Sequence, residues 1–550
     1  MQHILETIVL ALVEKQPRTK AEFDDIRRQT CNHLSVSQPP NRKLFSAYQT
    51  LVKKKRIKKQ PSIERLFTKA SVRSSSGIAV ITSLLKPYAC PGKCVYCPTE
   101  ARMPKSYVAT EPAAARSLRL NFDPYLLMQK RIEMLEQNGH PCDKIEYITK
   151  GGTWNAYPLK YQYWYVMESF KACNNFTRKK PVAHTAEEEW NDKLLEALIT
   201  ETEKEQRYNE GAGHRIIGIT LETRPDAITA KTIAHMRQQG CTRVELGLQA
   251  TDDRILELIK RGHTVDQFRK AIYLLRSAGF KVDLHFMPDL PGTTPEHDVE
   301  MYKQLFDDPA LRPDMVKIYP NTVIKTAELY EWYLDGRYKP YGDRALFDAL
   351  LQMKKLTPRY CRISRLIRDF PATEIEAGNI ITNLRELLAH RLKQQGEVCV
   401  CLRCREISRH QGEISKETSP QLFVEKYDTI GGTEYFLTFE DPQRIAVFGF
   451  LRLRLPTQQD PGVMTTLSEI KECAFIRELH VYGQMVEIGK TDAQASQHKG
   501  LGKKLVEAAE KIAAEAGFSK VAVISGVGVR GYYRKLGYKK VGTYMVKHLF

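Results

Sequence analysis

Six short apolar runs, rich in β-branched residues, alternate with helical stretches between residues 76 and 320 of the 550-residue chain. The runs span residues 77–84, 144–150, 215–221, 243–249, 281–287 and 315–319. Two of the stretches between them end at Gly240 and Gly279, as helix C-termini often do. Successive strand–helix units imply a parallel sheet, so we expect an α/β fold containing a partial (β/α)6 barrel. In such barrels the reacting groups lie at the carboxyl ends of the strands.

The length of the chain predicts about two to four domains. We divide it into a small helical domain (1–75), the barrel domain (76–365), a linker (366–420) and a second α/β domain (421–550). The first domain is indicated by apolar residues on one helix face: Ile4, Leu5, Ile8, Val9, Leu12 and Val13. The last domain is indicated by predicted strands at 443–454, 475–482 and 520–525 and by a predicted helix at 501–516.

The formal net charge of the chain is +19 at pH 7. This excess favours a polyanionic partner such as nucleic acid, and a basic surface that only promotes solubility is the alternative. Basic residues are densest in the segment 51–60, which contains Lys53, Lys54, Lys55, Arg56, Lys58 and Lys59. We expect this segment to be an arm that contacts nucleic-acid phosphates, with a solvated face as the alternative.

The longest apolar runs, 4–13 and 77–85, are shorter than the roughly 18–20 residues that a membrane-spanning helix needs. The N-terminal run is not followed by a small-residue cleavage site, so it predicts a helix and no secretion signal. We therefore expect a cytoplasmic protein without a membrane partner.

The chain contains 12 cysteines, and six of them fall in two tight clusters. Because the cytoplasm keeps thiols reduced, metal binding is expected in place of disulfides. The remaining cysteines are interpreted as small apolar core residues. These are Cys31, Cys142, Cys173, Cys241, Cys361 and Cys473.

The first cluster, CPGKCVYC at 90–97, follows the first predicted strand with the spacing Cys-x3-Cys-x2-Cys. Cys90, Cys94 and Cys97 can hold three irons of a [4Fe-4S] cluster and leave the fourth iron open. An open iron can chelate S-adenosylmethionine, whose reductive cleavage yields a deoxyadenosyl radical. A zinc site with a fourth ligand elsewhere is the alternative.

Polar residues at later strand ends are candidates for binding S-adenosylmethionine. Gly151, Gly152 and Thr153 follow the second strand, where paired glycines let a ligand approach the backbone closely. Glu222 follows the third strand, with a structural ion pair as its alternative role. Lys317, at the end of the sixth strand, is a candidate catalytic residue that could meet a phosphate or a thioester oxygen.

The second cluster, CVCLRC at 399–404, places three thiols within six residues. Cys399, Cys401 and Cys404 have a spacing typical of a structural zinc site, so we predict a zinc ion that holds the linker. Because these three thiols leave one zinc position open, His390 and His410 are the candidates for a fourth ligand.

The segment QHKGLGKKLVEAAE at 497–510 runs from a polar loop into an apolar-striped helix with the pattern Gln-x-x-Gly-x-Gly. Unpaired N–H groups and the positive end of the helix dipole make such a turn a binding site for a pyrophosphate. The segment RELHVYG at 477–483 supplies a strand before this turn, and RGYYRKLGY at 530–538 supplies tyrosines after it.

These motifs resemble two known families. The cysteine cluster and the strand-end residues resemble the radical S-adenosylmethionine superfamily and, more narrowly, the family of the Elongator catalytic subunit. That narrower resemblance includes LHFMPDLPGTTPEHD (284–298), KIYPNTVIKTAELY (317–330) and NLRELLAHRLKQQG (383–396). The segment 497–510 resembles the acetyl-CoA loop of the GCN5-related acetyltransferase fold.

The second resemblance implies an acetyl-CoA site. The strand backbone would line the pantetheine arm at Glu478, Leu479, His480 and Val481. The loop and helix start would bind the pyrophosphate through Gln497, Gly500, Leu501, Gly502, Lys503 and Lys504. Tyr533 would lie beside the thioester, and Tyr532 is a second catalytic candidate. Lys144 matches a family lysine that contacts acetyl-CoA from the barrel, with an ordinary strand-edge lysine as the alternative.

The family resemblance implies an enzyme that uses acetyl-CoA to install a carboxymethyl group at carbon 5 of the wobble uridine of tRNA. Its partners would be the anticodon region of tRNA, a reducing protein or small-molecule electron donor, and either a second copy of the chain or accessory subunits. Two other functions are kept as alternatives. One is a protein lysine acetyltransferase, and the other is a tRNA-binding scaffold whose cofactors are structural.

Overall fold

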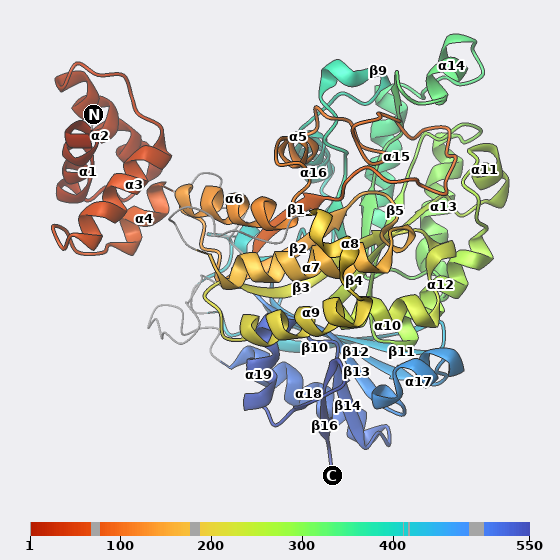
Figure 1. Cartoon of the computed structure of the whole chain (residues 1–550). Coiled ribbons are helices and arrows are strands. Elements are labelled where there is room, and N and C mark those ends of the chain that lie inside the picture. Colours follow the sequence, from red (N-terminus) through yellow and green to blue (C-terminus); the bar gives the residue numbers. More distant parts are fainter. Residues whose placement is uncertain (1, 68–76, 177–186, 411, 416–417, 483–499) are drawn as a thin grey trace.

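The computed structural model describes residues 2–67, 77–176, 187–410, 412–415, 418–482 and 500–550. Figure 1 shows a helical N-terminal domain beside α6, an α/β barrel domain, and a second α/β domain packed against the barrel. Within the described residues, no helix is long and apolar enough to cross a membrane.

The N-terminal domain consists of α1 (Gln2–Lys15), α2 (Lys20–His33), α3 (Asn41–Lys53) and α4 (Pro61–Phe67). The hydroxyl of Thr19 caps α2 by accepting a hydrogen bond from the backbone N–H of Glu22 at 3.2 Å. The predicted apolar stripe of α1 forms part of a closed core, which includes Ile8, Val9, Leu12, Phe23, Leu44, Tyr48, Leu51 and Phe67. Helix α3 also contacts α6 of the barrel domain.

The predicted partial barrel is confirmed, and its sheet has seven parallel strands in the order β1-β2-β3-β4-β5-β6-β8. The strands are β1 (Ala79–Leu84), β2 (Lys144–Lys150), β3 (Arg215–Thr223), β4 (Cys241–Gln249), β5 (Lys281–Phe286), β6 (Met315–Ile318) and β8 (Arg362–Arg365). The sequence did not predict β8, because this strand has only four residues and two of them are arginines. A separate pair of short strands, β7 (Thr322–Ile324) and β9 (Ile375–Gly378), is antiparallel.

Helices between the strands cover the outer face of this sheet, as Figure 1 shows. They include α6 (Pro124–Gln137), α7 (Leu159–Asn174), α9 (Leu195–Asn209), α10 (Ala230–Gln238), α12 (Val265–Ser277), α13 (Pro295–Asp307) and α15 (Asp343–Leu356). Shorter or peripheral helices are α5 (Pro112–Arg119), α8 (Glu187–Asp192), α11 (Asp253–Leu258), α14 (Leu329–Leu334) and α16 (Leu384–Gln394). Thr229 and Thr264 form capping boxes at the starts of α10 and α12, which fixes where these two helices begin.

The second α/β domain has a seven-stranded sheet in the order β10-β11-β12-β13-β14-β16-β15. Its strands are β10 (Gln421–Thr429), β11 (Gly432–Glu440), β12 (Val447–Pro456), β13 (Ala474–Val481), β14 (Lys520–Val523), β15 (Lys539–Val541) and β16 (Tyr544–His548). The helices are α17 (Pro461–Thr466), α18 (Leu501–Glu515) and α19 (Arg530–Lys535). The sequence pattern predicted neither the β10–β11 hairpin nor the β15–β16 hairpin. Their outer strands lack a strong apolar face, because β10 largely alternates between exposed and half-buried residues and β15 has only three residues, all exposed.

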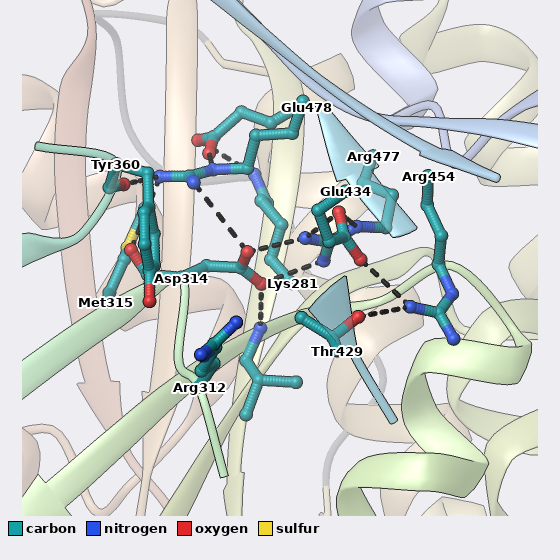
Figure 2. Close-up of polar contacts among 12 residues, drawn as sticks. Lys281, Arg312, Asp314, Met315, Tyr360, Thr429, Glu434, Arg454, Arg477 and Glu478 are labelled. Atoms are coloured by element: carbon teal, nitrogen blue, oxygen red, sulfur yellow. Dashed lines mark hydrogen bonds and ion pairs between the residues drawn. The ribbon is translucent and has the colours of Figure 1, made fainter. Parts of the chain in front are cut away.

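A buried cluster of charged side chains joins the two α/β domains (Figure 2). Asp314, just before β6, pairs with Arg477 of β13 at 2.5 Å. Arg477 also pairs with Glu434 of β11 at 2.8 Å, and Glu434 in turn pairs with Arg276 of α12 at 2.8 Å. Arg454 of β12 lies 3.0 Å from the same carboxylate. The side chains of these five residues are at most 1% exposed, so the interface depends on mutual charge compensation.

Burial of Asp314 opposes its ionisation, but Arg477, Arg276 and Arg452 hold the pKa of its carboxyl group well below the usual range. Glu478 of β13 extends the cluster by pairing with Arg452 at 2.9 Å and with Lys281 of β5 at 3.5 Å. The cluster therefore fixes β13 beneath the amino-terminal ends of the barrel strands.

We expect Asp314→Ala to lower the free energy of unfolding by about 3–5 kcal/mol, because it leaves buried arginines without their counter-charge. Urea unfolding at pH 7, where Asp314 is ionised, measures the change. Asp307→Ala, which removes an aspartate that is 57% exposed, is the matched control and should change stability by no more than about 0.5 kcal/mol. Equal effects of the two substitutions would show that the cluster does not stabilise the interface.

Candidate active site

A cavity of about 1110 Å³ lies on the inner face of the barrel sheet. At the carboxyl ends of the strands it is lined by the three cysteines of the first cluster. At the amino ends it is lined by residues that include Glu146, Arg243 and Arg362. A cavity at this position agrees with the rule that barrel enzymes place their reacting groups at the carboxyl ends of the strands.

The first cysteine cluster lies in the loop after β1. The Sγ atom of Cys90 accepts a hydrogen bond from the backbone N–H of Gly92 at 3.4 Å and lies 3.8 Å from Oγ1 of Thr153. Cys94 accepts a hydrogen bond from Arg261 at 3.5 Å. A hydrogen bond from Cys97, together with Arg261, lowers the pKa of Cys94 to about 4 against the effect of burial. A thiolate in this position is suited to bind metal.

Glycines let the backbone of this loop and of its neighbour come close together. A Cβ atom on Gly92 would lie 2.5 Å from Nη1 of Arg224, so a larger residue would displace the guanidinium. Gly152 has a φ of +86°, which favours glycine, and it lies in the turn after β2. The structure therefore brings Gly152, Thr153, Arg224 and the cysteine loop to one end of the cavity.

Glu222, at the end of β3, accepts a hydrogen bond from the hydroxyl of Tyr107 at 2.8 Å. Its carboxylate also lies 3.9 Å from Nζ of Lys150 and 3.8 Å from the ring of His285. Burial opposes ionisation of Glu222, but Lys150 and His285 lower the pKa of its carboxyl group. Glu222 therefore forms structural ion pairs and also lines the wall of the cavity.

Lys317 points into the cavity and forms an ion pair with Glu245 of β4. Glu245 is fully buried and also pairs with Lys150 at 3.3 Å and with His285 at 3.4 Å. Burial disfavours the charged form of Glu245, but Lys150 and Lys317 hold the pKa of its carboxyl group well below the usual value. We did not predict a role for Glu245 from the sequence. The signal that could have found it is a carboxylate within β4, all of whose residues are buried.

Several buried polar atoms along the cavity have no hydrogen-bond partner among the described residues. They are Nη1 of Arg224, Oε1 of Gln249, Oε1 of Glu245, Oδ1 of Asp283 and Nη1 of Arg362. Buried polar groups are normally satisfied by protein, water or ligand, so this wall fits a polar bound molecule. The open polar atoms and the low-pKa thiol of Cys94 are suited to an iron–sulfur cluster and S-adenosylmethionine.

The second cysteine cluster lies on the segment that joins the two α/β domains. The sulfur atoms of Cys399, Cys401 and Cys404 lie within 4.8 Å of one another. Hydrogen bonds from Cys399 and Cys404 hold the pKa of Cys401 well below its usual value. None of the 12 cysteines, all of which fall within the described ranges, forms a disulfide. This donor set fits a thiolate-bound metal such as zinc.

The two histidines predicted as fourth ligands lie differently. His410 uses Nε2 to contact the carbonyl oxygen of Cys404 at 2.8 Å and Nδ1 to contact Glu413 at 2.7 Å. His390 is exposed on α16. In the described part of the chain, the group of potential ligand atoms around the three sulfurs includes no histidine.

The predicted acetyl-CoA residues lie where β13 separates from β14. The parallel pairing of these strands ends at Ile476 and Val523, so in the described residues the later backbone of β13 has no strand partner on that side. This free edge contains Glu478, Leu479, His480 and Val481. An unpaired strand edge can donate and accept hydrogen bonds to a bound chain such as pantetheine.

Helix α18 begins beside this free edge. Gly500, the residue before α18, has a φ of +90°, and the helix N-terminus that follows comprises Leu501, Gly502, Lys503 and Lys504. A Cβ atom on Gly502 would lie 2.8 Å from the hydroxyl of Tyr532 and 3.5 Å from the side chain of Val481. Gln497 lies outside the described residues.

The other acetyl-CoA candidates lie on both domains. Tyr532 is 37% exposed, and the neighbouring Tyr533 is buried with its ring edge-to-face at 5.4 Å. Lys144 is the first residue of β2 and is half-buried at the amino end of the barrel sheet.

Three protein families match the chain in order. The Radical SAM superfamily matches residues 85–305, the Radical_SAM C-terminal domain matches 313–394, and the Acetyltransferase (GNAT) family matches 403–538. Fold and site thus define a radical S-adenosylmethionine protein with a fused GNAT domain.

Relatives narrow this class further. The tRNA uridine(34) acetyltransferase of Methanocaldococcus jannaschii is 38% identical over 100% of this chain and 98% of its own length. Elongator complex protein 3 of Danio rerio is 39% identical over 87% of this chain and 85% of its own length. The solved structure of the archaeal Methanocaldococcus infernus Elp3, with an N-terminal deletion, matches with a TM-score of 0.71 and 38% identity over 86% of this chain and 99% of that chain. The chain belongs to the family of tRNA uridine(34) acetyltransferases and Elongator complex protein 3.

Proposed function

We propose that this protein modifies the wobble uridine of tRNA, using acetyl-CoA to install a carboxymethyl group at carbon 5. The observation that carries the proposal is the rigid union of two sites in one chain. A cavity with three clustered cysteines opens on the barrel, and the buried charge cluster around Asp314 holds a GNAT domain against the same barrel. Each domain alone would support a simpler activity, whereas their union supports one shared reaction.

Cys90, Cys94 and Cys97 would hold three irons of a [4Fe-4S] cluster, and Gly151, Gly152, Thr153 and Glu222 would hold S-adenosylmethionine beside it. When bound, these groups supply a deoxyadenosyl radical, which suits carbon 5 because this carbon is a weak nucleophile. Their reduction needs an electron donor, for which we propose a reducing protein or a small molecule.

Residues of the second domain would bind acetyl-CoA. The free edge of β13, at Glu478, Leu479, His480 and Val481, would hydrogen-bond the pantetheine arm. The N-terminus of α18, together with Gln497 and Gly500, would bind the pyrophosphate through its unpaired N–H groups and its dipole. Tyr533, Tyr532 and Lys144 would contact the thioester end.

Lys317 and Lys150 share the carboxylate of Glu245 inside the cavity. Burial disfavours the charged form of Lys150, yet Glu245, Tyr107 and Glu222 raise its pKa well above the usual value, so it stays charged. A charged ammonium at Lys317 or Lys150 can donate a hydrogen bond to the thioester oxygen or to a tRNA phosphate. These donors are fixed before substrate arrives, which avoids reorganisation during the reaction.

The basic arm of the N-terminal domain supports tRNA as the substrate. Lys53, Lys54, Lys55, Arg56, Lys58 and Lys59 are all exposed. Arg56 pairs with Glu6 at 2.7 Å, and Lys59 pairs with Glu64 at 3.8 Å. Arginines at the cavity wall, among them Arg116, Arg365 and Arg368, would receive phosphates near the wobble base. The wobble nucleotide must leave its stack to enter the cavity, at a cost of a few kcal/mol.

The proposed reaction is tested with anaerobically reconstituted protein, S-adenosylmethionine, acetyl-CoA and unmodified tRNA, followed by mass spectrometry of nucleosides and deoxyadenosine. We expect carboxymethyluridine and deoxyadenosine from the unmodified chain. Cys94→Ala should abolish both products while leaving tRNA affinity unchanged, because the thiolate would be a ligand of the iron cluster. Cys173→Ala, at a buried cysteine of α7 away from the cavity, should keep both products.

Three outcomes would contradict this function. Full turnover by Cys94→Ala would exclude the iron cluster assigned to this loop. Acetylated protein without altered tRNA would favour a lysine acetyltransferase. Tight tRNA binding without either product in the unmodified chain would favour a scaffold.

The basic arm is tested by replacing its six residues with glutamine. We expect weaker tRNA binding and a salt dependence whose slope falls by about one for each phosphate that the arm no longer neutralises. Filter binding across a salt series measures both quantities. A control of equal charge change replaces six exposed lysines elsewhere: Lys231, Lys270, Lys303, Lys511, Lys535 and Lys539. If both variants had the slope of the unmodified chain, the arm would be only a solvated face.

For the second cysteine cluster we propose a structural zinc ion bound by Cys399, Cys401 and Cys404. Elemental analysis should find about one zinc per chain, and Cys401→Ser should lose it because three thiolates supply most of the binding energy. Cys361→Ala, at a buried cysteine of the preceding segment, should retain the zinc. Absence of stoichiometric zinc from the unmodified protein would remove this assignment.

A further inference from the structure

The barrel cavity continues to the amino-terminal ends of the strands, opposite the cysteine loop and on the side where Lys281 of the barrel contacts Glu478 of the GNAT domain. Its lining there includes Glu146 of β2, Arg243 of β4, Arg362 of β8 and Arg403 of the linker. Glu146 and Arg243 pair at 2.6 Å, and Arg362 pairs with Glu406 at 2.7 Å. The cavity therefore extends along the strands of the barrel and is not confined to their carboxyl ends.

The free edge of β13 lies at this amino-terminal end. Glu478 pairs with Lys281, the first residue of β5, at 3.5 Å. Burial lowers the pKa of the neighbouring His480, and the charges that act on its ring include Glu146 and Arg362 of the barrel. The predicted pantetheine strand thus lies close to the amino-terminal end of the cavity.

Polar atoms without a protein partner among the described residues continue along the cavity from this end. Nη1 of Arg362, Oδ1 of Asp283 and Oε1 of Glu245 are buried and make no hydrogen bond to any residue in the described ranges. They lie on three strands of the same inner face, and Gln249 and Arg224 continue the series toward the cysteine loop. A wall of this kind is suited to water or to a polar chain that passes through, and unsuited to a closed apolar core.

We propose that the hollow interior of the barrel is the passage by which the acyl end of an acyl-CoA thioester travels from β13 to the radical site. The acyl-pantetheine arm would enter between the Glu146–Arg243 pair and Arg362, and its acyl group would reach the level of Glu245 and Lys317. This inference rests on the proposed function, because it assumes that β13 and α18 bind the coenzyme.

The chemistry of the arm matches the lining. The acyl end of the coenzyme carries no charge but has two amides and a thioester carbonyl. Arg243 and Lys317 are already held in ion pairs, so their charges are compensated and do not attract a free anion. Each still has N–H groups that can donate hydrogen bonds to the amide and thioester oxygens. Entry of the acyl-pantetheine arm at the amino ends of the strands also leaves the carboxyl end of the barrel open for the tRNA base.

The passage is tested by affinity labelling of cysteines placed inside it. Ser364→Cys on β8 and Thr82→Cys on β1 put a thiol on opposite edge strands of the cavity, and both changes are small. Thr465→Cys, on the exposed surface of α17, is the matched control. Each variant is reconstituted with its iron cluster, treated with bromoacetyl-CoA or with bromoacetamide, and mapped by peptide mass spectrometry.

A bound coenzyme raises the local concentration of its bromoacetyl group. We therefore expect the thiols at 364 and 82 to react with bromoacetyl-CoA faster than with bromoacetamide by about 10-fold or more, relative to the thiol at 465. Excess free CoA should abolish this preference. Labelling at either passage position that CoA suppresses supports the passage even if the other variant folds poorly.

Calorimetric titration with CoA separates this inference from the proposed function. CoA binding to the unmodified chain without coenzyme-dependent labelling at 364 and 82 would overturn the passage alone. No CoA binding would overturn both the acetyl-CoA site and the passage. Equal labelling rates at 364, 82 and 465 would likewise exclude the passage.

Discussion

The pairing of Asp314 and Glu434 with four buried arginines is the constraint on which the arrangement of this protein depends. Charges removed from water are tolerated only when each has a partner at close range. Arg276 comes from the barrel domain, whereas Arg452, Arg454 and Arg477 come from the GNAT domain. Any rotation of one domain against the other would leave a buried charge without a partner, so the cluster selects one orientation of the domains.

That orientation has consequences for both cofactor sites. It puts the free edge of β13 below the amino ends of the barrel strands, while the cysteine loop stays at their carboxyl ends. The cavity extends from the cysteine loop to the amino ends of the strands, and its interior charges are compensated by one another, as Glu245 is by Lys150 and Lys317. A reaction that needs atoms from two cofactors can then take place without large domain movements.

Much of the fold and of the site follows from local sequence patterns. The six apolar runs predicted the first six barrel strands, and the Cys-x3-Cys-x2-Cys spacing marked the loop that lines the cavity. Strand β8 was not predicted, because a four-residue strand that begins and ends with arginine has no apolar pattern. A role for Glu245 was not predicted either, because the residues with which it interacts lie 95 and 72 residues away along the chain.

The motifs can be identified without a structure: the clustered cysteines, the glycine turn before α18, the basic arm and the resemblance to the two families. These features are readable because each depends on residues close together in the chain. Two features became visible only in the folded chain: one cavity extends from the cysteine loop to the amino ends of the barrel strands, and His410 contacts the Cys404 carbonyl and Glu413. These features depend on folding because charge pairing and burial join residues far apart in sequence, as Arg276 and Glu434 are at a separation of 158 residues.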